Sequence, residues 1–254
     1  MHRLSGYRAS QQSGVRGRFY PGGMSGWHEQ LGVFDLETTG VDTETARIVT
    51  AHVGVINEQG ITVSRQDWVI DPMVEIPDGA AAVHGYTTER VRLEGMDAAT
   101  GVAEIVSALR VLFERGIPVV AYNAPYDFTV LNREAKRHGV TPLENPLPVI
   151  DPLVIDKAVD RYRKGKRTLE LTAQFYGVDL GDDAHDAGYD AIAAGRVAQA
   201  IAVKFAAELA MTAAELHARQ VDWFRQQEES YAEFRRNKLG DLNFVATGTW
   251  PERF

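Results

Sequence analysis

The stretch LGVFDLETTG occupies residues 31–40 and combines an apolar strand with two acidic side chains near its end. Asp35 and Glu37 lie two residues apart, so the pleat of a strand directs both carboxylates to one face, while Phe34 and Leu36 point to the other. Two like charges at the end of an apolar strand are costly unless a cation lies between them, and a hard divalent ion is the usual solution. We therefore predict that Asp35 and Glu37 bind metal; the alternative is that solvent surrounds both.

Apolar runs on the C-terminal side of this stretch predict an α/β fold. RIVTAHVGVIN (47–57) and ITVSRQDWVI (61–70) predict two more strands, and the short polar links predict an antiparallel meander. Residues 71–97, which include Pro77 and His84, are expected to form a loop. Helices and strands then alternate. The predicted helices cover 98–115, 124–139, 152–163, 169–177, 186–208 and 212–238, and the predicted strands cover 118–123 and 147–151. The pattern therefore predicts a mixed five-stranded sheet flanked by helices, with an extra C-terminal helix.

Composition excludes several classes of protein. The 254 residues are 44% hydrophobic and include no cysteine, which excludes a wholly disordered chain, disulfides, thiol nucleophiles and cysteine-ligated metals. No window approaches the roughly 18 apolar residues of a membrane span, and no signal peptide is visible, so we expect a cytoplasmic protein without a membrane partner. The net charge of −8 argues against a nucleic-acid partner unless the acidic residues gather where cations bind.

We expect three parts along the chain. Residues 1–28 hold four arginines, no acidic residue and no periodic pattern, and are predicted to be a disordered or loosely docked leader. Residues 29–208 form the predicted catalytic domain. Residues 209–254 form a C-terminal helical extension with one apolar stripe. The extension is expected to pack against the domain; the alternative is that it docks a partner subunit or a second copy of the chain.

Two later segments place acidic residues where they can join Asp35. Asp127 follows the strand end at Asn123 in the first turns of a helix, and ligands collect at strand ends in open α/β sheets. A helix dipole alone also explains an acid at this position. The segment DDAHDAGYDA (182–191) surrounds His185 with four acids, and at neutral pH a histidine beside carboxylates can accept a proton.

Together these segments resemble a known family. FDLETTG (34–40), YNAPYDFTVL (122–131) and HDAGYDA (185–191) are similar, in order and spacing, to the three motifs of the DEDD superfamily of 3′-to-5′ exonucleases, in particular proofreading epsilon-like enzymes. The resemblance covers residues 31 to about 205. It implies an RNase H-like fold. It also implies metal ligands for two divalent ions, Mg²⁺ or Mn²⁺: Asp35, Glu37, Asp127 and Asp190.

The resemblance also implies roles for other residues. His185 matches the general base of the histidine (DEDDh) subclass, because the tyrosine subclass needs tyrosine at position 186, where this chain has aspartate. AAVHGYT (81–87) resembles the loop that approaches the terminal nucleotide, which makes His84 a candidate substrate contact. The candidate contacts within the acidic motifs are Thr38 and Asn123.

The function implied is hydrolysis of phosphodiester bonds at the 3′ end of single-stranded DNA, releasing nucleoside 5′-monophosphates by a two-metal-ion mechanism with His185 as base. An RNA 3′-to-5′ exonuclease has the same residues and is the main alternative. A non-catalytic binding subunit is the rival from another class, although all five catalytic positions are present. The resemblance to proofreading enzymes makes a polymerase subunit the expected partner if the C-terminal extension docks one. Residues 161–167, RYRKGKR, are a further prediction: Arg163, Lys166 and Arg167 are candidate phosphate contacts, unless the run is merely a solvated loop.

Overall fold

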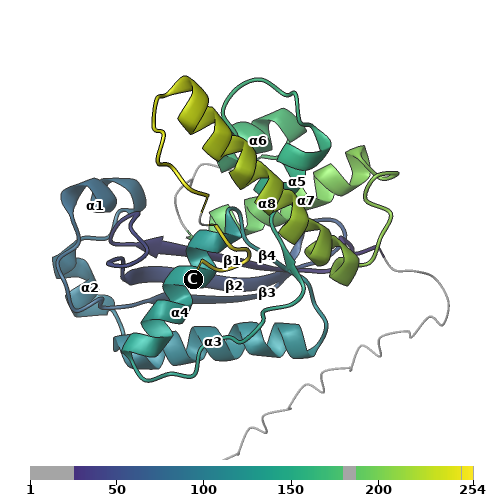
Figure 1. Cartoon of the computed structure of the whole chain (residues 1–254). Helices are drawn as coiled ribbons and strands as arrows, with labels where there is room; N and C mark the ends of the chain where they lie inside the picture. The colour runs from purple at the N-terminus through teal and green to yellow at the C-terminus, as the bar shows by residue number, and fades with distance from the viewer. Residues whose placement is uncertain (1–25, 180–186, 247, 254) are drawn as a thin grey trace, which may run out of the picture.

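Figure 1 shows the computed structural model of the chain, which describes residues 26–179, 187–246 and 248–253. Five strands form one sheet in the order β3-β2-β1-β4-β5. The first three strands pair antiparallel, whereas β1 pairs parallel with β4, and β4 with β5. The strands are β1 (Leu31–Thr38), β2 (Ile48–Ile56), β3 (Thr62–Val69), β4 (Val119–Val120) and β5 (Val149–Ile150). The predicted mixed five-stranded sheet is confirmed.

Helices cover both faces of this sheet (Figure 1). On one face lie α3 (Ala98–Glu114) and α4 (Ala124–Arg137), and on the other lie α5 (Pro152–Val159), α6 (Leu169–Tyr176) and α7 (Ala187–Lys204). The long helix α8 (Ala213–Lys238) begins with a capping box formed by Thr212 and Glu215. None of the helices in the described part of the chain is long and apolar enough to span a membrane.

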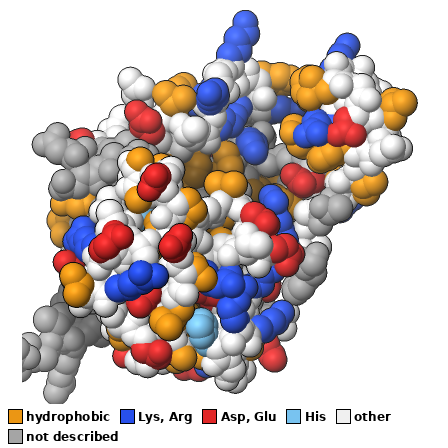
Figure 2. Space-filling view, turned by 90° about the vertical axis from the view of Figure 1, so that its left-hand side faces the viewer, with side chains coloured by type: hydrophobic (Ala, Val, Ile, Leu, Met, Phe, Trp, Pro, Cys, Tyr) orange, Lys and Arg blue, Asp and Glu red, His pale blue; other side chains and the backbone are white. Residues whose placement is uncertain are grey.

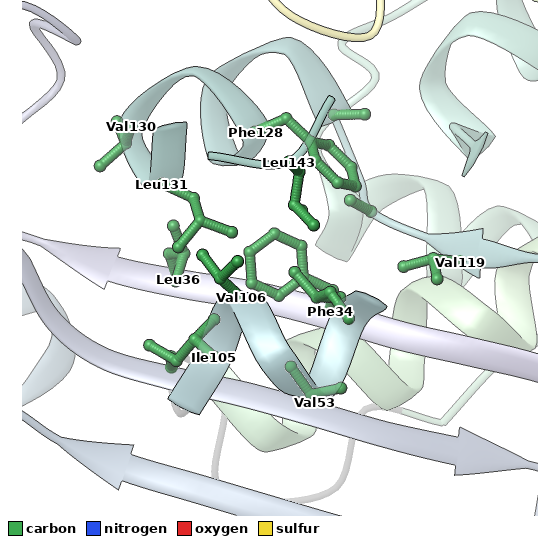
Figure 3. Packing of buried hydrophobic residues seen from close by; sticks show 14 of the residues in the cluster. Phe34, Leu36, Val53, Ile105, Val106, Val119, Phe128, Val130, Leu131 and Leu143 are labelled. Atoms are coloured by element: carbon green, nitrogen blue, oxygen red, sulfur yellow. The ribbon is translucent and has the colours of Figure 1, made fainter. Parts of the chain in front are cut away.

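The two hydrophobic clusters follow the alternation of β1. Phe34 and Leu36 pack toward α3 and α4, where the Phe34 and Phe128 rings meet edge to face with centroids 5.4 Å apart (Figure 3). Leu31 and Val33 belong to the second cluster, with side chains of α5, α7 and α8. Because side chains alternate along a strand, Asp35 and Glu37 share the face of Val33. This arrangement directs them away from the Phe34 cluster.

The expectation of a loop at 71–97 is wrong. This segment contains two short helices, α1 (Asp78–His84) and α2 (Thr88–Glu94). Thr87 caps α2 by accepting a hydrogen bond from the backbone of Arg90. Ile76 and Val91 bury themselves against Val49 of β2, which ties both helices to the end of the sheet. Several boundaries also differ: α5 ends at Val159 and α7 at Lys204, earlier than predicted, and β4 and β5 are shorter than the predicted strands 118–123 and 147–151.

Both ends of the described chain are attached to the domain. Trp27 falls within the predicted leader, yet its ring is buried and its Nε1 donates to the Leu209 carbonyl at 3.3 Å. The packed chain therefore begins before residue 29. At the other end, the Gln220 side chain of α8 accepts from Asp151 N and donates to Val149 O. The expectation that the C-terminal helix packs against the domain is confirmed, and docking to a partner stays a prediction.

Candidate active site

Asp127 lies in the first turn of α4 and is 3% exposed. Burial raises the pKa of Asp127 well above its usual value. Hydrogen bonds from the backbone of Asp127 and Leu36 lower this pKa, whereas the carboxylates of Asp151 and Glu37 raise it further. The contact with Leu36 is possible because β1 pairs with β4 only at Gly32 and Val33. The Asp127 carboxylate therefore lies against the backbone of the residue between Asp35 and Glu37.

Tyr126 lies close to the acidic side chains at the end of β1. Its hydroxyl is within hydrogen-bond distance of Thr38 Oγ1 and of the Gly40 carbonyl. Burial raises the pKa of Tyr126, the hydrogen bond with Thr38 lowers it, and the carboxylates of Asp127, Glu37 and Asp35 raise it further. One phenol thus lies within electrostatic range of three carboxylates. Asp35 and Glu37 are half-buried, so the cluster is open to solvent on one side.

Asp190 reaches the same end of β1 because α7 runs antiparallel to that strand. The Gln199 amide donates to the carbonyls of His28 and Asn57, near the start of β1. Gly195 packs so tightly on Val33 that an added Cβ would lie 2.6 Å from Cγ1 of that valine. Along the axis of α7, Asp190 lies about 7.5 Å before Gly195. Along β1, Asp35 lies about 6.6 Å beyond Val33. Asp190 and Asp35 therefore lie toward the same edge of the sheet.

His185, the predicted general base, lies outside the described residues. Within 26–179, 187–246 and 248–253, no group of three or more histidine, aspartate or glutamate side chains is already arranged to hold a metal ion. The structure thus brings Asp35, Glu37 and Asp127 to one strand end and places the start of α7, which carries Asp190, toward the same edge of the sheet. Their role as metal ligands stays a prediction.

Asp151 is a buried carboxylate that the sequence analysis missed. It caps α5 and is fully buried. Its Oδ1 accepts from the backbone of Asn123 and Leu153, and its Oδ2 accepts from Ala124, each at 3.0 Å; Trp250 Nε1 lies 3.4 Å from Oδ2. Burial raises the pKa of Asp151 to about 6, against the effect of those donors.

This carboxylate fixes the turn that starts α4. Asn123 adopts a left-handed conformation with φ 64°, which is unusual for a residue with a side chain. The hydrogen bonds from Asn123 and Ala124 to Asp151 hold that turn, and thereby set where Asp127 points four residues later. The sequence signal was present: aspartate before proline, directly after an apolar strand, is typical of a helix N-cap followed by Pro at N1.

Two predicted substrate contacts lie beside the cluster. Thr38 ends β1, and His84 ends α1 with its ring buried. The His84 Nδ1 accepts from the backbone of Tyr86 at 3.2 Å, and its buried Nε2 has no hydrogen-bond partner within the described residues. Burial lowers the pKa of His84, and the nearby Thr38 backbone partly opposes this effect. A neutral ring therefore lies against the Thr38 backbone at the end of β1.

Two arginines of the basic run pair with a buried carboxylate. Arg163 and Arg167 both pair with the carboxylate of Asp156, which is fully buried, and Tyr176 donates to the same carboxylate at 2.7 Å. The two guanidinium groups balance a buried charge, which leaves them less available to phosphate. Their role as phosphate contacts stays a prediction. Lys166 is exposed, and its role stays a prediction.

Comparison with known proteins identifies the family. A family model described as Exonuclease matches residues 33–198. A DNA polymerase III subunit epsilon-like protein from Rhodobacter capsulatus is 30% identical over 164 residues, which are 63% of this chain and 22% of that protein. A PolC-type DNA polymerase III from Streptococcus thermophilus is 30% identical over 167 residues, which are 65% of this chain and 10% of that protein. The chain thus spans a small part of the length of either relative.

A solved structure has the same fold. Escherichia coli exonuclease I in complex with a dA16 oligonucleotide is similar with a TM-score of 0.61 at 18% identity, covering 72% of this chain and 42% of that one. The matched family model spans most of the catalytic domain predicted from the sequence. The chain belongs to the RNase_T exonuclease family. The predicted family and RNase H-like fold are confirmed, while assignment to the histidine subclass stays a prediction.

Proposed function

We propose that this protein is a metal-dependent 3′-to-5′ exonuclease that hydrolyses single-stranded DNA and releases nucleoside 5′-monophosphates. The observation that carries the proposal is the position of the Asp127 carboxylate against the backbone of Leu36, between Asp35 and Glu37. Family membership supports the reaction type. Two similar proteins, a DNA polymerase III epsilon-like protein and an exonuclease I bound to an oligodeoxynucleotide, favour DNA as the substrate.

The carboxylate cluster fits divalent cations. Asp127 is a buried acid whose charged form is disfavoured by burial and by neighbouring carboxylates, and a cation beside it would reverse both effects. Oxygen donors suit Mg²⁺ and Mn²⁺. Asp35, Glu37, Asp127 and Asp190 would hold two such ions. When bound, they would activate water and stabilise the charge on the leaving 3′-oxygen.

The remaining residues would handle the proton and the substrate. His185 would accept the proton of the water that attacks phosphorus, as a base with a pKa near neutrality can. The His84 ring, which lies against the Thr38 backbone at the end of β1, would contact a substrate oxygen. Thr38 is already within hydrogen-bond distance of Tyr126, so its hydroxyl would help to position the Gly40 turn as much as to contact the nucleotide.

Digestion of 5′-labelled single-stranded DNA tests the proposal. With Mg²⁺ or Mn²⁺ the products should form a ladder that shortens from the 3′ end, and the ladder should be absent in EDTA and with Asp35→Ala. RNA of the same sequence is digested in parallel. Digestion of RNA alone would replace DNA by RNA as the substrate, and no digestion of either, with folded protein, would refute the catalytic assignment.

A further inference from the structure

A groove of about 750 Å³ lies between α5, α8 and the C-terminal tail. This volume falls within the roughly 300–1,000 Å³ of ligand-binding clefts. Asn123, the residue between β4 and α4, is one of its lining residues, so the groove reaches the edge of the sheet where the carboxylates gather. Figure 2 shows that one side of the molecule is hollowed, with hydrophobic and basic side chains around the hollow. We call this feature the α5–α8 groove.

The charge of the α5–α8 groove is opposite to that of the whole protein. Its lining contains one acidic residue, Glu228, against four basic ones: Lys157, Arg161, Arg167 and Arg253. Arg167 already forms an ion pair with Asp156. Within the described residues, Lys157, Arg161 and Arg253 make no ion pair. Burial lowers the pKa of Lys157, and the nearby carboxylates of Asp151, Glu228 and Asp156 oppose this effect. In a chain of net charge −8, the excess of basic residues in this groove gives it a local attraction for phosphate groups.

Aromatic side chains line the α8 wall of the groove. Trp223, Tyr231 and Phe234 are spaced so that they share one side of the helix. Phe234 is 49% exposed, so its ring has surface open to a ligand, whereas Tyr231, 46% exposed, also packs against Phe244 and Arg235. Aromatic rings interleaved with cations are the combination that holds single-stranded nucleic acid, because bases stack on the rings while phosphates meet the cations.

We propose that the α5–α8 groove holds the single-stranded DNA upstream of the nucleotide being removed. The proposal rests on the proposed function, because it needs a 3′ end at the carboxylate cluster. Asn123 connects the two places. Lys157 and Arg161 contact phosphates of the strand, and Phe234 stacks with a base. The groove therefore provides affinity for long substrates that a mono- or dinucleotide does not use.

Binding to the full-length protein tests the groove separately from catalysis. The probe is 5′-fluorescein-labelled oligothymidylate of about 16 nucleotides, measured by fluorescence anisotropy in EDTA over a series of salt concentrations. Arg161→Ala should weaken binding several-fold and reduce the salt slope by about one. Arg115→Ala is the matched control, because Arg115 is an exposed cation at the end of α3 outside the groove, and it should change neither value.

Two substitutions at Phe234 test whether the aromatic side chains of α8 stack with bases. Phe234→Ala should weaken binding by roughly fivefold or more, the loss expected for one base stack, and Phe234→Tyr should retain most of the affinity. With Mg²⁺, the same groove variants should lower the ratio of kcat/KM for the long oligonucleotide to kcat/KM for a dinucleotide, whereas Arg115→Ala should not.

The outcomes distinguish the two proposals. If the wild type binds the oligonucleotide but hydrolyses no substrate, the proposed function fails, and the anisotropy measurements still decide on the groove. If Arg161→Ala and Phe234→Ala bind DNA as tightly as the wild type does, the groove proposal is overturned. That same result is expected if the groove instead receives a polypeptide.

Discussion

Replacing Asp151 by alanine tests whether this buried carboxylate supports the active-site helix. The change removes the acceptor for three backbone donors, those of Asn123, Ala124 and Leu153, at a fully buried position. Asp97→Ala is the matched control. Asp97 also caps a helix, α3, but it is exposed, and Thr100 supplies both of its hydrogen bonds.

The magnitude follows from the number of donors and their burial. A buried donor left without a partner costs about 1–3 kcal/mol, so three donors at the lower end of this range cost about 3–5 kcal/mol. Alanine also removes a buried charge whose pKa is raised to about 6, which offsets part of the loss. This offset is about 3 kcal/mol at pH 7 but only about 1 kcal/mol at pH 4.5. At pH 4.5 we therefore expect a net decrease of about 3 kcal/mol in the free energy of unfolding for Asp151→Ala. For Asp97→Ala we expect about 1 kcal/mol.

Urea denaturation followed by tryptophan fluorescence and circular dichroism measures both values. DNA hydrolysis by folded Asp151→Ala should also fall, since the turn at Asn123 that orients Asp127 is no longer held. If Asp151→Ala is no less stable than Asp97→Ala, the cost of burying the carboxylate cancels its hydrogen bonds, and our reasoning about this residue is refuted.

Three further predictions concern pH, the basic run and the general base. Burial gives Asp151 a pKa of about 6, above the roughly 3.9 of an unfolded chain, so the folded protein binds the extra proton between these values. The stability advantage of the wild type over Asp151→Ala should therefore shrink as pH rises from about 4 to 6.5; an advantage that grows instead would contradict the assignment. Arg167→Ala should destabilise the protein by about 3 kcal/mol because it weakens the pairing of buried Asp156, whereas Lys166→Ala, at the exposed neighbour, should stay within about 0.5 kcal/mol. Equal melting temperatures for these two variants would argue against the structural role of Arg167. His185→Ala should lower kcat about 10²- to 10⁴-fold while DNA affinity stays within about twofold, and undiminished turnover would remove His185 from the mechanism.

The sequence predicted those features that depend on short-range periodicity. Asp35 and Glu37 could be placed on one face of a strand because alternation along LGVFDLE is a local property. The sequence-based prediction failed at 71–97, because α1 and α2 are seven residues each and too short to show a helical period. Their positions depend on Ile76 and Val91 packing against Val49 of a distant strand, which no local pattern reveals.

Contacts between different elements of the fold explain why the sequence did not predict the roles of the basic run and of Asp151. The run of five basic residues at 161–167 looks like a phosphate-binding surface until Asp156 is seen buried between Arg163 and Arg167. Asp151 was overlooked because its importance comes from accepting hydrogen bonds from residues 27 and 28 positions earlier in the chain. The aspartate–proline signal at 151 and 152 was local, however, and could have been used to predict an N-cap.

Mn²⁺ binding to the wild type and to Asp127→Asn, measured by electron paramagnetic resonance together with DNA hydrolysis in the same samples, tests the central claim most directly. Asparagine keeps the size of Asp127 and an oxygen for the Leu36 backbone, but it removes the charge. We predict that the wild type binds about two ions per chain and hydrolyses DNA over the same range of Mn²⁺ concentration. The variant should bind fewer ions and lose hydrolysis, with a melting temperature in EDTA no lower than that of the wild type. Equal Mn²⁺ binding and hydrolysis by both proteins would contradict the account.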